Sequence, residues 1–331
     1  MRAVGKALGR ILIVLVVLIA AVGLFGPREP APLSASFDDR KFGEGVQVYF
    51  ESVEANFDDI TPGTEKRVVW QPGREEQRTP VSLLYIHGYS ATSEEIRPVP
   101  DQIAAAMGAN LVYTRLTGHG RDGAAMADAT VADWMQDVAE GLAAARAVGE
   151  TVIVMSTSTG GTLAAAAALD PMLSDRVAAM IFVSPNFRIQ SAGQALLTWP
   201  AGRTWLPWLI GPTRSWEPYN AAHGTYWTTI YPTEAVLPMA AVVKAVESQD
   251  FSNVAIPALF WFSSQDTVVS PEATQAFAAR WGGPVAIQNV TMGPGDDPDS
   301  HVVAGDIMSP GQTDATVSGM LEWLGKTLPS P

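Results

Sequence analysis

Short runs of apolar, mostly β-branched residues alternate along this chain with stretches of helical periodicity. The apolar runs lie at 81–87, 110–116, 151–156, 177–184, 257–264 and 284–290. The helical stretches between them lie at 94–107, 131–148, 160–169, 271–281 and 313–327. Near-continuous apolar strands suit a parallel sheet that is covered on both faces. The alternation therefore predicts an α/β fold, with a mostly parallel central sheet flanked by helices.

Two departures from the alternation shape the expected domain organisation. Residues 45–57 and 65–71 have the composition of strands and are expected to add antiparallel edges at the start of the sheet. Between 186 and 250 prolines are frequent, and half of the ten tryptophans fall here: Trp199, Trp205, Trp208, Trp216 and Trp227. This predicts an insertion of short helices and loops over the carboxyl edge of the sheet. The expected division is a first core part at 46–185, the insertion at 186–250 and a second core part at 251–331.

Residues 1–26 have the pattern of an export signal. Residues 1–10 carry basic side chains and no acid, and residues 11–25 carry no polar side chain. The favoured interpretation is a transmembrane helix retained as a signal anchor, with the folded body on the periplasmic side of the inner membrane. The alternative is a signal peptide that is cleaved to give a secreted protein. Residues 27–45 are rich in proline, glycine and charge, and are expected to form a linker.

Composition excludes several classes of site. The net charge of −13 argues against nucleic acid as a partner. The absence of cysteine excludes disulfides, thiol catalysis and zinc thiolate sites. The four histidines show no metal-binding spacing, and no glycine-rich nucleotide motif occurs, so neither a metal nor a cofactor is expected. The acidic stretch 293–300 is interpreted as a solvated loop rather than a calcium site. The oligomeric state stays open.

Polar residues follow the expected strands at the edge where open α/β sheets form their sites. They are His87, Arg115, His119, Ser156, Ser158, Ser184, Asp266 and His301. Three of them, Ser158, Asp266 and His301, stand in the chain order serine, acid, histidine. A serine hydroxyl needs an imidazole to take its proton, and the imidazole needs a carboxylate to fix its tautomer and charge. Ser158 also lies in a strand–turn–helix context, with Gly160 two residues later, and is therefore the candidate nucleophile.

With these pieces the chain resembles the α/β-hydrolase superfamily, in its carboxylesterase and monoacylglycerol-lipase-like branch of serine hydrolases. The matching motifs are YIHGY at 85–89, RLTGHG at 115–120, DWMQDV at 133–138, STSTGG at 156–161, SSQDTVVSPE at 263–272 and DSHVVAGD at 299–306. The resemblance implies a catalytic triad of Ser158, Asp266 and His301. It also implies an oxyanion hole made by the backbone N–H groups of Tyr89 and Thr159.

The resemblance further implies that residues 186–250 form a cap over the substrate pocket, and that the chain cleaves carboxylic esters through an acyl-enzyme on Ser158. Candidate pocket residues are Trp199, Trp205 and Trp227, with ordinary packing inside the cap as the alternative. An anchored body with an aromatic cap suits small-molecule or lipid esters such as monoacylglycerols. The same triad also serves peptidases, thioesterases and lactonases. A catalytically silent binding protein with the hydrolase fold is the alternative from another class.

Other roles for the site residues stay open at this point. Ser156 stands where the family carries the first glycine of the nucleophile turn, and as nucleophile it would put the glycines out of register. Ser158 as a mere helix cap is a structural alternative, because capping favours serine too. Asp306 as the acid would break the chain order. A turn role for Asp266 and a surface position for His301 are further alternatives. Structural roles are expected for His87, His119 and Arg115.

Overall fold

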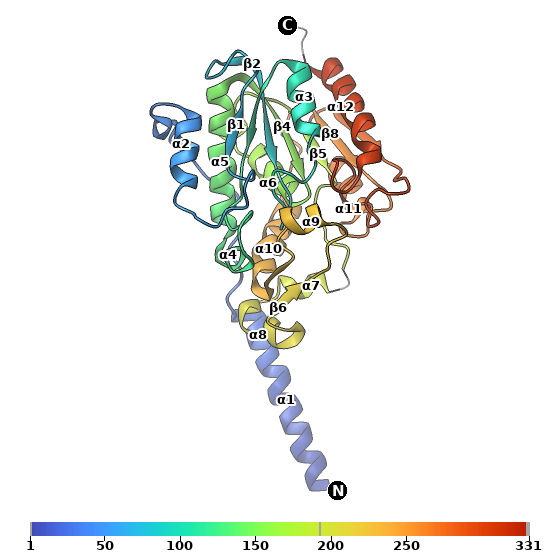
Figure 1. Ribbon diagram of the computed structural model, residues 1–331. Helices are drawn as coiled ribbons and strands as arrows, with labels where there is room; N and C mark the ends of the chain where they lie inside the picture. The colour runs from blue at the N-terminus through green and yellow to red at the C-terminus, as the bar shows by residue number, and fades with distance from the viewer. Residues whose placement is uncertain (1, 192, 329–331) are drawn as a thin grey trace.

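The computed structural model describes residues 2–191 and 193–328, and its centre is a seven-stranded sheet (Figure 1). In sheet order the strands are β1 (Arg67–Val69), β3 (Asn110–Tyr113), β2 (Thr79–Ile86), β4 (Gly149–Thr157), β5 (Val177–Val183), β8 (Ala258–Phe262) and β9 (Val285–Asn289). Strand β1 runs antiparallel to β3, and every other pair in this sheet is parallel. The mostly parallel α/β architecture that the alternation predicts is confirmed.

The central strands divide their side chains between two hydrophobic cores. On β2, Leu84 and Ile86 belong to one core, whereas Leu83 and Tyr85 belong to the other. The first core includes residues of α5 (Val131–Val148), α6 (Thr159–Ala168) and α11 (Pro271–Ala278). The second core includes residues of α3 (Val99–Met107) and α12 (Thr313–Thr327). Because side chains alternate across a strand, a continuous apolar run supplies both faces of the sheet.

Residues 45–57 do not form the expected edge strand. They form the helix α2 (Val46–Glu54), which buries Val46, Phe50 and Glu54. These three residues recur at a spacing of four and lie on one face of the helix. The strand prediction was wrong because it rested on the β-branched and aromatic composition rather than on the spacing. The second expected edge, at 65–71, does contain the antiparallel strand β1.

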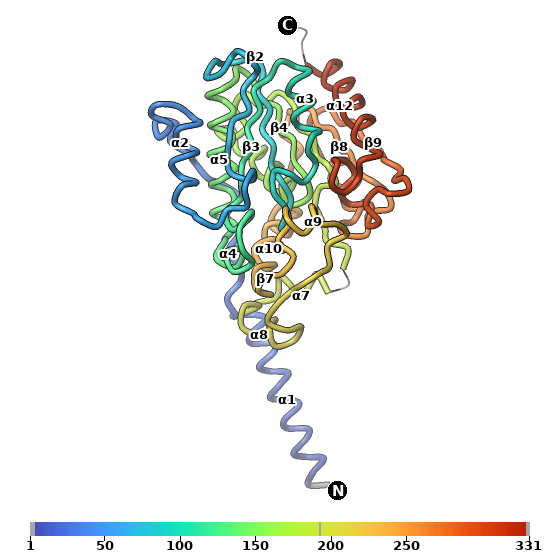
Figure 2. Tube along the Cα trace, viewed as in Figure 1, coloured from blue at the N-terminus to red at the C-terminus, as the bar shows by residue number. Residues whose placement is uncertain are grey.

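Residues 186–250 lie outside the seven-stranded sheet. They form α7 (Gln194–Leu197), α8 (Gly202–Ile210), α9 (Ala221–Tyr226), α10 (Val236–Glu247) and the antiparallel pair β6 (Thr213–Ser215) and β7 (Ile230–Pro232). Helix α10 packs on α6, and β7 contacts the short helix α4 (Gly123–Asp128). In Figure 2 this segment, yellow to orange, lies between the sheet and the first helix of the chain.

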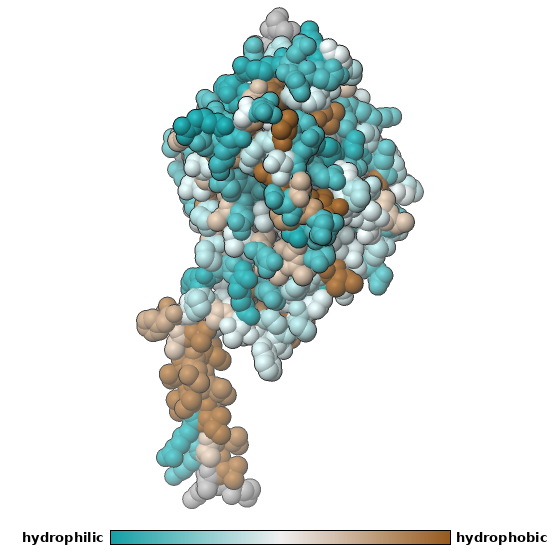
Figure 3. Space-filling view, turned by 60° about the vertical axis from the view of Figure 1, so that its left-hand side comes forward, coloured by the Kyte–Doolittle hydropathy of each residue, from teal (hydrophilic) through white to brown (hydrophobic). Residues whose placement is uncertain are grey.

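The first helix, α1 (Arg2–Phe25), projects from the body as an apolar column (Figure 3). Its segment Val4–Phe25 has the length and apolar composition to cross a membrane, a property that an anchor and a signal sequence share. Residues 27–45, expected as a linker, pack on the body instead. Phe42 in this stretch is buried in the first core, and the ring of Phe37 lies 5.0 Å from it. The segment that leads from α1 is therefore attached to the folded body.

Candidate active site

Ser158 lies alone on the sharp turn between the end of β4 and the start of α6. Its φ of 50° and ψ of −119° are costly for a residue with a side chain and persist where the surroundings fix them. Its N–H donates to the carbonyl of Val183 at 3.0 Å, and its carbonyl accepts from the N–H groups of Gly161 and Asn186, both at 2.9 Å. The turn aims the hydroxyl into a pocket at the carboxyl edge of the sheet.

Gly160 allows this turn to approach the neighbouring strand. A Cβ at this position would lie 2.3 Å from the carbonyl oxygen of Ile86 and 2.5 Å from that of His87. Because both obstacles are backbone atoms, Gly160→Ala is expected to lower the free energy of unfolding by about 2–3 kcal/mol in chemical denaturation. The control is Gly325→Ala in α12, where nothing lies within 4 Å of the added carbon. This change should raise stability by about 0.5–1 kcal/mol, and equal effects at both sites would contradict the packing argument.

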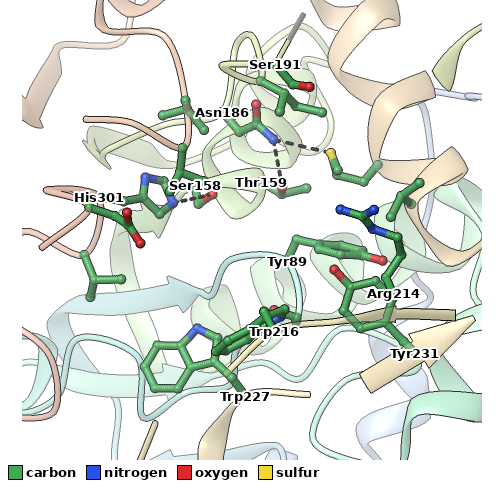
Figure 4. Close-up of a pocket in the computed structure, with 18 of the residues that line it drawn as sticks. Tyr89, Ser158, Thr159, Asn186, Ser191, Arg214, Trp216, Trp227, Tyr231 and His301 are labelled. Atoms are coloured by element: carbon green, nitrogen blue, oxygen red, sulfur yellow. Dashed lines mark hydrogen bonds between the residues drawn. The ribbon is translucent and has the colours of Figure 1, made fainter. Parts of the chain in front are cut away.

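Three side chains from separate segments form one chain of hydrogen bonds. The Nε2 atom of His301 lies 3.1 Å from the Oγ atom of Ser158 (Figure 4). The Nδ1 atom of the same ring lies 2.8 Å from the Oδ2 atom of Asp266. All three residues are buried. A carboxylate can only accept a hydrogen bond, so Nδ1 carries the proton of the neutral ring. Nε2 is then free of a proton and can accept the one on the serine hydroxyl.

The carboxylate of Asp266 is held on both sides. Its Oδ1 atom accepts the N–H groups of Val268 at 2.8 Å and Val269 at 2.9 Å, while Oδ2 faces the imidazole. Burial lowers the pKa of His301, but the carboxylate of Asp266, with smaller contributions from Glu95 and Asp297, raises this pKa to about 9. The Asp266–His301 pair therefore stabilises a protonated imidazole. A histidine that takes up a proton from a nucleophile needs this stabilisation.

The sequence did not predict Glu95, a buried carboxyl group beside these residues. Its Oε2 atom accepts the N–H of Gly88 at 2.7 Å and the hydroxyl of Tyr85 at 3.0 Å. A Cβ on Gly88 would lie 2.6 Å from Glu95 Oε1 and 3.0 Å from Ser158 Cβ, so the two side chains flank the same glycine. Burial raises the pKa of Glu95 to about 7. The adjacent Glu94 is partly buried and pairs with Arg67 and Arg97, and two glutamates in a row give no sign of which one lies beside Ser158.

The backbone at His301 is held by Asp297, which the sequence also did not single out. Its Oδ2 atom accepts the N–H groups of His301 at 3.0 Å and Val302 at 2.7 Å. Asp297 is buried, so the interpretation of 293–300 as a solvated loop was wrong at this position. A carboxylate that accepts two backbone N–H groups fixes a loop without any spacing motif.

The backbone N–H groups of Tyr89 and Thr159 border the pocket on either side of Ser158. Thr159 is the first residue of α6, where helical N–H groups have no partner within the helix. In residues 2–191 and 193–328, neither N–H donates to another protein group. The side-chain amide of Asn186 donates to the Thr159 hydroxyl at 3.3 Å, as the dashed line in Figure 4 shows. Both N–H groups are thus available to an oxygen atom in the pocket.

The pocket has a volume of about 620 Å³ and holds Ser158 and His301 at one end. Its apolar wall comes mainly from the insertion, through Leu196, Leu197, Leu206, Leu209, Ile210, Val236 and Met239. Polar groups of the lining include Arg214, Tyr219 and Asp299. An apolar pocket with a few polar groups at one end suits an organic ligand whose reactive group lies beside Ser158.

Of the three tryptophans predicted for the pocket, Trp227 lines it and the other two do not. Trp199 lies against the first helix, since a Cβ on Gly23 would be 3.2 Å from its ring. The Trp205 indole N–H donates to the carbonyl of Pro200 at 2.9 Å. The predictions for Trp199 and Trp205 were wrong because an aromatic-rich segment does not reveal which face each ring takes. Trp216 also lines the pocket.

The remaining candidates hold loops around the site. His87 Nε2 accepts the N–H of Leu116 at 3.1 Å, and burial holds the pKa of His87 well below its usual range. The Arg115 guanidinium pairs with buried Glu54 through bonds of 2.7 and 2.8 Å. Burial lowers the pKa of His119 to about 4. The alternative acid, Asp306, accepts the hydroxyl of Thr313 at 3.2 Å instead of facing His301. Neutral histidines and a paired arginine agree with the structural roles expected of them.

A family model described as serine aminopeptidase, S33, matches residues 78–289. A thermostable monoacylglycerol lipase from Bacillus sp. (strain H-257) is 36% identical over 84 residues. That match covers 25% of this chain and 33% of the relative, so the chain spans about a third of that relative's length.

Two solved structures have similar architecture. One comes from work on LipS and LipT, two metagenome-derived lipolytic enzymes, with a TM-score of 0.62 and 19% identity over 81% of this chain and 99% of that one. The other is a soluble variant of monoglyceride lipase from Saccharomyces cerevisiae in complex with a substrate analog. Its TM-score is 0.60 at 11% identity, over 81% of this chain and 92% of that one. At these identities the likeness is one of fold.

Proposed function

The chain belongs to the serine aminopeptidase S33 family and has the α/β-hydrolase fold, and on this premise we propose that it cleaves carboxylic esters through an acyl-enzyme on Ser158. The observation that carries the proposal is the unbroken chain of hydrogen bonds from Ser158 through His301 to Asp266, at the end of an apolar pocket. These residues supply a nucleophile, a base and a group that orients the base.

In the proposed reaction, Ser158 Oγ attacks the ester carbonyl carbon while His301 Nε2 takes the hydroxyl proton. The carbonyl oxygen becomes negative and accepts hydrogen bonds from the N–H groups of Tyr89 and Thr159; each such donor typically contributes about 3–4 kcal/mol to the transition state. The C–O bond to the alcohol then breaks, and the imidazolium returns its proton to the leaving alcohol. Water, deprotonated by His301, releases the acid and restores the serine.

The pocket supports esters with an apolar acyl chain. Aliphatic side chains of the insertion supply most of the apolar lining, which suits a hydrocarbon tail. The name of the Bacillus relative, a monoacylglycerol lipase, points to the same substrate class. We therefore infer a small-molecule or lipid ester as the substrate, with monoacylglycerols as the leading candidates.

Helix α1 supports attachment to a membrane. Its apolar segment Val4–Phe25 has the length of a span, and its basic residues precede the apolar run. On this basis we propose that the amino terminus stays in the cytoplasm and that the catalytic body lies on the periplasmic side of the inner membrane. Cleavage of the helix as a signal peptide would instead release the body as a secreted enzyme.

The test of the proposed activity is a series of p-nitrophenyl esters from acetate to dodecanoate. We expect kcat/KM to rise with chain length, by up to roughly fourfold per methylene while the chain still finds apolar wall. Aminoacyl p-nitroanilides serve as the comparison, because the family model is named for an aminopeptidase. Faster cleavage of the anilides would favour a peptidase, and no turnover of any ester would favour a silent binding protein.

Glu95→Gln is expected to move the pH dependence of kcat/KM to lower pH. Burial lowers the pKa of His301, and the Glu95 carboxylate, after that of Asp266, acts to raise it. Since His301 must be neutral to act as a base, the acidic limb should shift down by roughly half to one pH unit when this charge is removed. The neighbouring Glu94→Gln, which removes a partner of Arg67 and Arg97 but leaves the Glu95 carboxylate in place, is the control and should leave the profile unchanged.

The same substitution should change the pH dependence of stability. The pKa of Glu95 rises from 4.5 to about 7 on folding, so the folded chain holds this proton more tightly. Wild-type stability should therefore fall as the pH rises between these values, and Glu95→Gln should remove that contribution. Denaturant titrations at several pH values measure it. A variant with an unchanged pH–rate profile and an unchanged pH–stability profile would rule out the role inferred from the geometry.

A further inference from the structure

A cluster of exposed apolar side chains lies where α1 meets the insertion. Leu24 and Phe25 at the end of α1 are 77% and 86% exposed. On α8, Trp208, Leu209 and Ile210 are 90%, 62% and 42% exposed. These five residues are called the apolar rim. Large apolar side chains exposed on two neighbouring elements are typical of a surface that is covered in the working protein.

The segment that directly follows α1 is bonded to the insertion at the start of α8. The Arg203 guanidinium on α8 donates to both carboxylate oxygens of Glu29, at 2.9 and 2.6 Å. The N–H of Ala201 donates to the carbonyl of Pro27 at 2.6 Å. Helix α8 consequently lies beside the carboxyl end of α1, as Figure 1 shows. Whatever surrounds the end of α1 also surrounds the exposed face of α8.

The depth of α8 relative to a bilayer follows from the point at which the apolar part of α1 ends. The apolar segment ends at Phe25, and Glu29 is already paired with Arg203, so the change from apolar to charged surroundings occurs within this short stretch. If α1 spans a bilayer, this stretch lies at the membrane–water boundary. Tryptophan is enriched at that boundary, since its ring is apolar and its N–H is polar. Trp208 therefore has the exposure and the chemistry of an interfacial residue.

The apolar rim is continuous with the proposed active site. Leu209 and Ile210 are exposed, and both also line the pocket that ends at Ser158 and His301. An acyl chain that enters beside α8 would therefore pass along apolar wall from the surface to the nucleophile. A water-soluble substrate would gain nothing from an apolar entrance on the side that bears α1.

We propose that the apolar rim lies in the interfacial layer of the bilayer that α1 spans, and that ester substrates enter the pocket from the lipid past Leu209 and Ile210. The substrate part rests on the proposed function, whereas the position of the rim does not. The chain carries a net charge of −13, so attraction to anionic lipid does not account for the contact. Burial of apolar side chains does account for it, and zwitterionic lipid is sufficient.

The absence of cysteine permits a direct measurement of depth. The full chain carrying Trp208→Cys is spin-labelled in single-copy phosphatidylcholine nanodiscs, and collision with oxygen is compared with collision with a water-soluble nickel chelate. The control is Met172→Cys, which is 74% exposed and follows α6, away from the insertion. The label at 208 should be protected from the chelate and accessible to oxygen, and the label at 172 should show the reverse.

Two results would overturn the position of the rim. Equal exposure of both labels to the chelate would place α8 in water. Protection at 208 that arises only when two copies share a disc would make the surface a contact between copies of this chain. Neither result depends on turnover, so the measurement is independent of the proposed ester activity.

Turnover tests the route of entry. Trp208 does not line the pocket, so Trp208→Ser should leave hydrolysis of soluble p-nitrophenyl butyrate unchanged. Hydrolysis of a monoacylglycerol in the same nanodiscs should fall by about thirtyfold, the change expected for loss of a hot-spot aromatic at an interface. Equal rates on the membrane-borne ester would overturn the entry route. Failure of the wild type on both esters would overturn the proposed function, while the depth measurement would still decide the position of the rim.

Discussion

Ser158→Ala is expected to abolish ester hydrolysis and covalent labelling by a fluorophosphonate probe. Among the described residues, the Ser158 hydroxyl is the one hydrogen-bonded to His301 Nε2, so its loss leaves the base without a nucleophile to activate. Removing a triad serine lowers kcat by about five to six orders of magnitude in the best-studied case, and a similar loss is expected here. Initial rates with p-nitrophenyl butyrate measure turnover, and mass spectrometry of the labelled peptide identifies the residue.

The matched control is Ser156→Gly, which restores the glycine that the family carries at this position. Ser156 lies within β4, paired with Phe182, and its hydroxyl donates to the carbonyl of Ile181 at 3.3 Å. It does not contact the imidazole, so the variant should keep its activity and its label. The cost should be limited to stability, at about 0.5–1 kcal/mol for a glycine inside a strand. Loss of activity in this variant, together with survival of Ser158→Ala, would identify Ser156 as the nucleophile.

The fold could be predicted where apolar periodicity was long. The strands β2, β4, β5 and β8 and the helix α5 follow from runs whose side chains are mostly buried, and packing leaves such runs little choice. Residues 45–57 could not be assigned in this way, because Val46 and Phe50 favour strands by type and a helix by spacing. Only packing against the core selects the helix. The attachment of 27–45 to the body depends in the same way on contacts of Phe37 and Phe42 that composition does not specify.

The candidate site was predictable to the extent that it follows chain order. Ser158, Asp266 and His301 follow the strands β4, β8 and β9 in an order that few other sites share, and the structure brings them into contact. Glu95 and Asp297 were missed because they act through hydrogen bonds to backbone N–H groups, which need no spacing pattern. Their signal is burial of a charge, and burial becomes visible only in three dimensions.

Asp266→Asn is expected to lower kcat/KM by about three to four orders of magnitude while leaving the fold intact. An amide of the same shape can still accept the N–H groups of Val268 and Val269, but it no longer holds His301 in the tautomer that presents a bare Nε2 to the serine. It also removes the main group that raises the pKa of His301 to about 9, so burial then lowers this pKa. A pH–rate profile should show the small residual activity persisting to lower pH than in the wild type.

The pH dependence of the stability loss distinguishes Asp266→Asn from a variant that misfolds. The pKa of His301 is higher in the folded wild type than the value of 6.5 typical of an unpaired histidine, so the Asp266–His301 pair contributes most below that pH. This contribution is lost as the pH rises through about 9. Asp266→Asn should therefore lose more stability at pH 6 than at pH 10 in denaturant titrations. Asp306→Asn, which alters a carboxylate bonded to Thr313 rather than to the imidazole, is the control. Asp306→Asn should retain activity. If it lost activity while Asp266→Asn remained active, Asp306 would be the acid that orients His301.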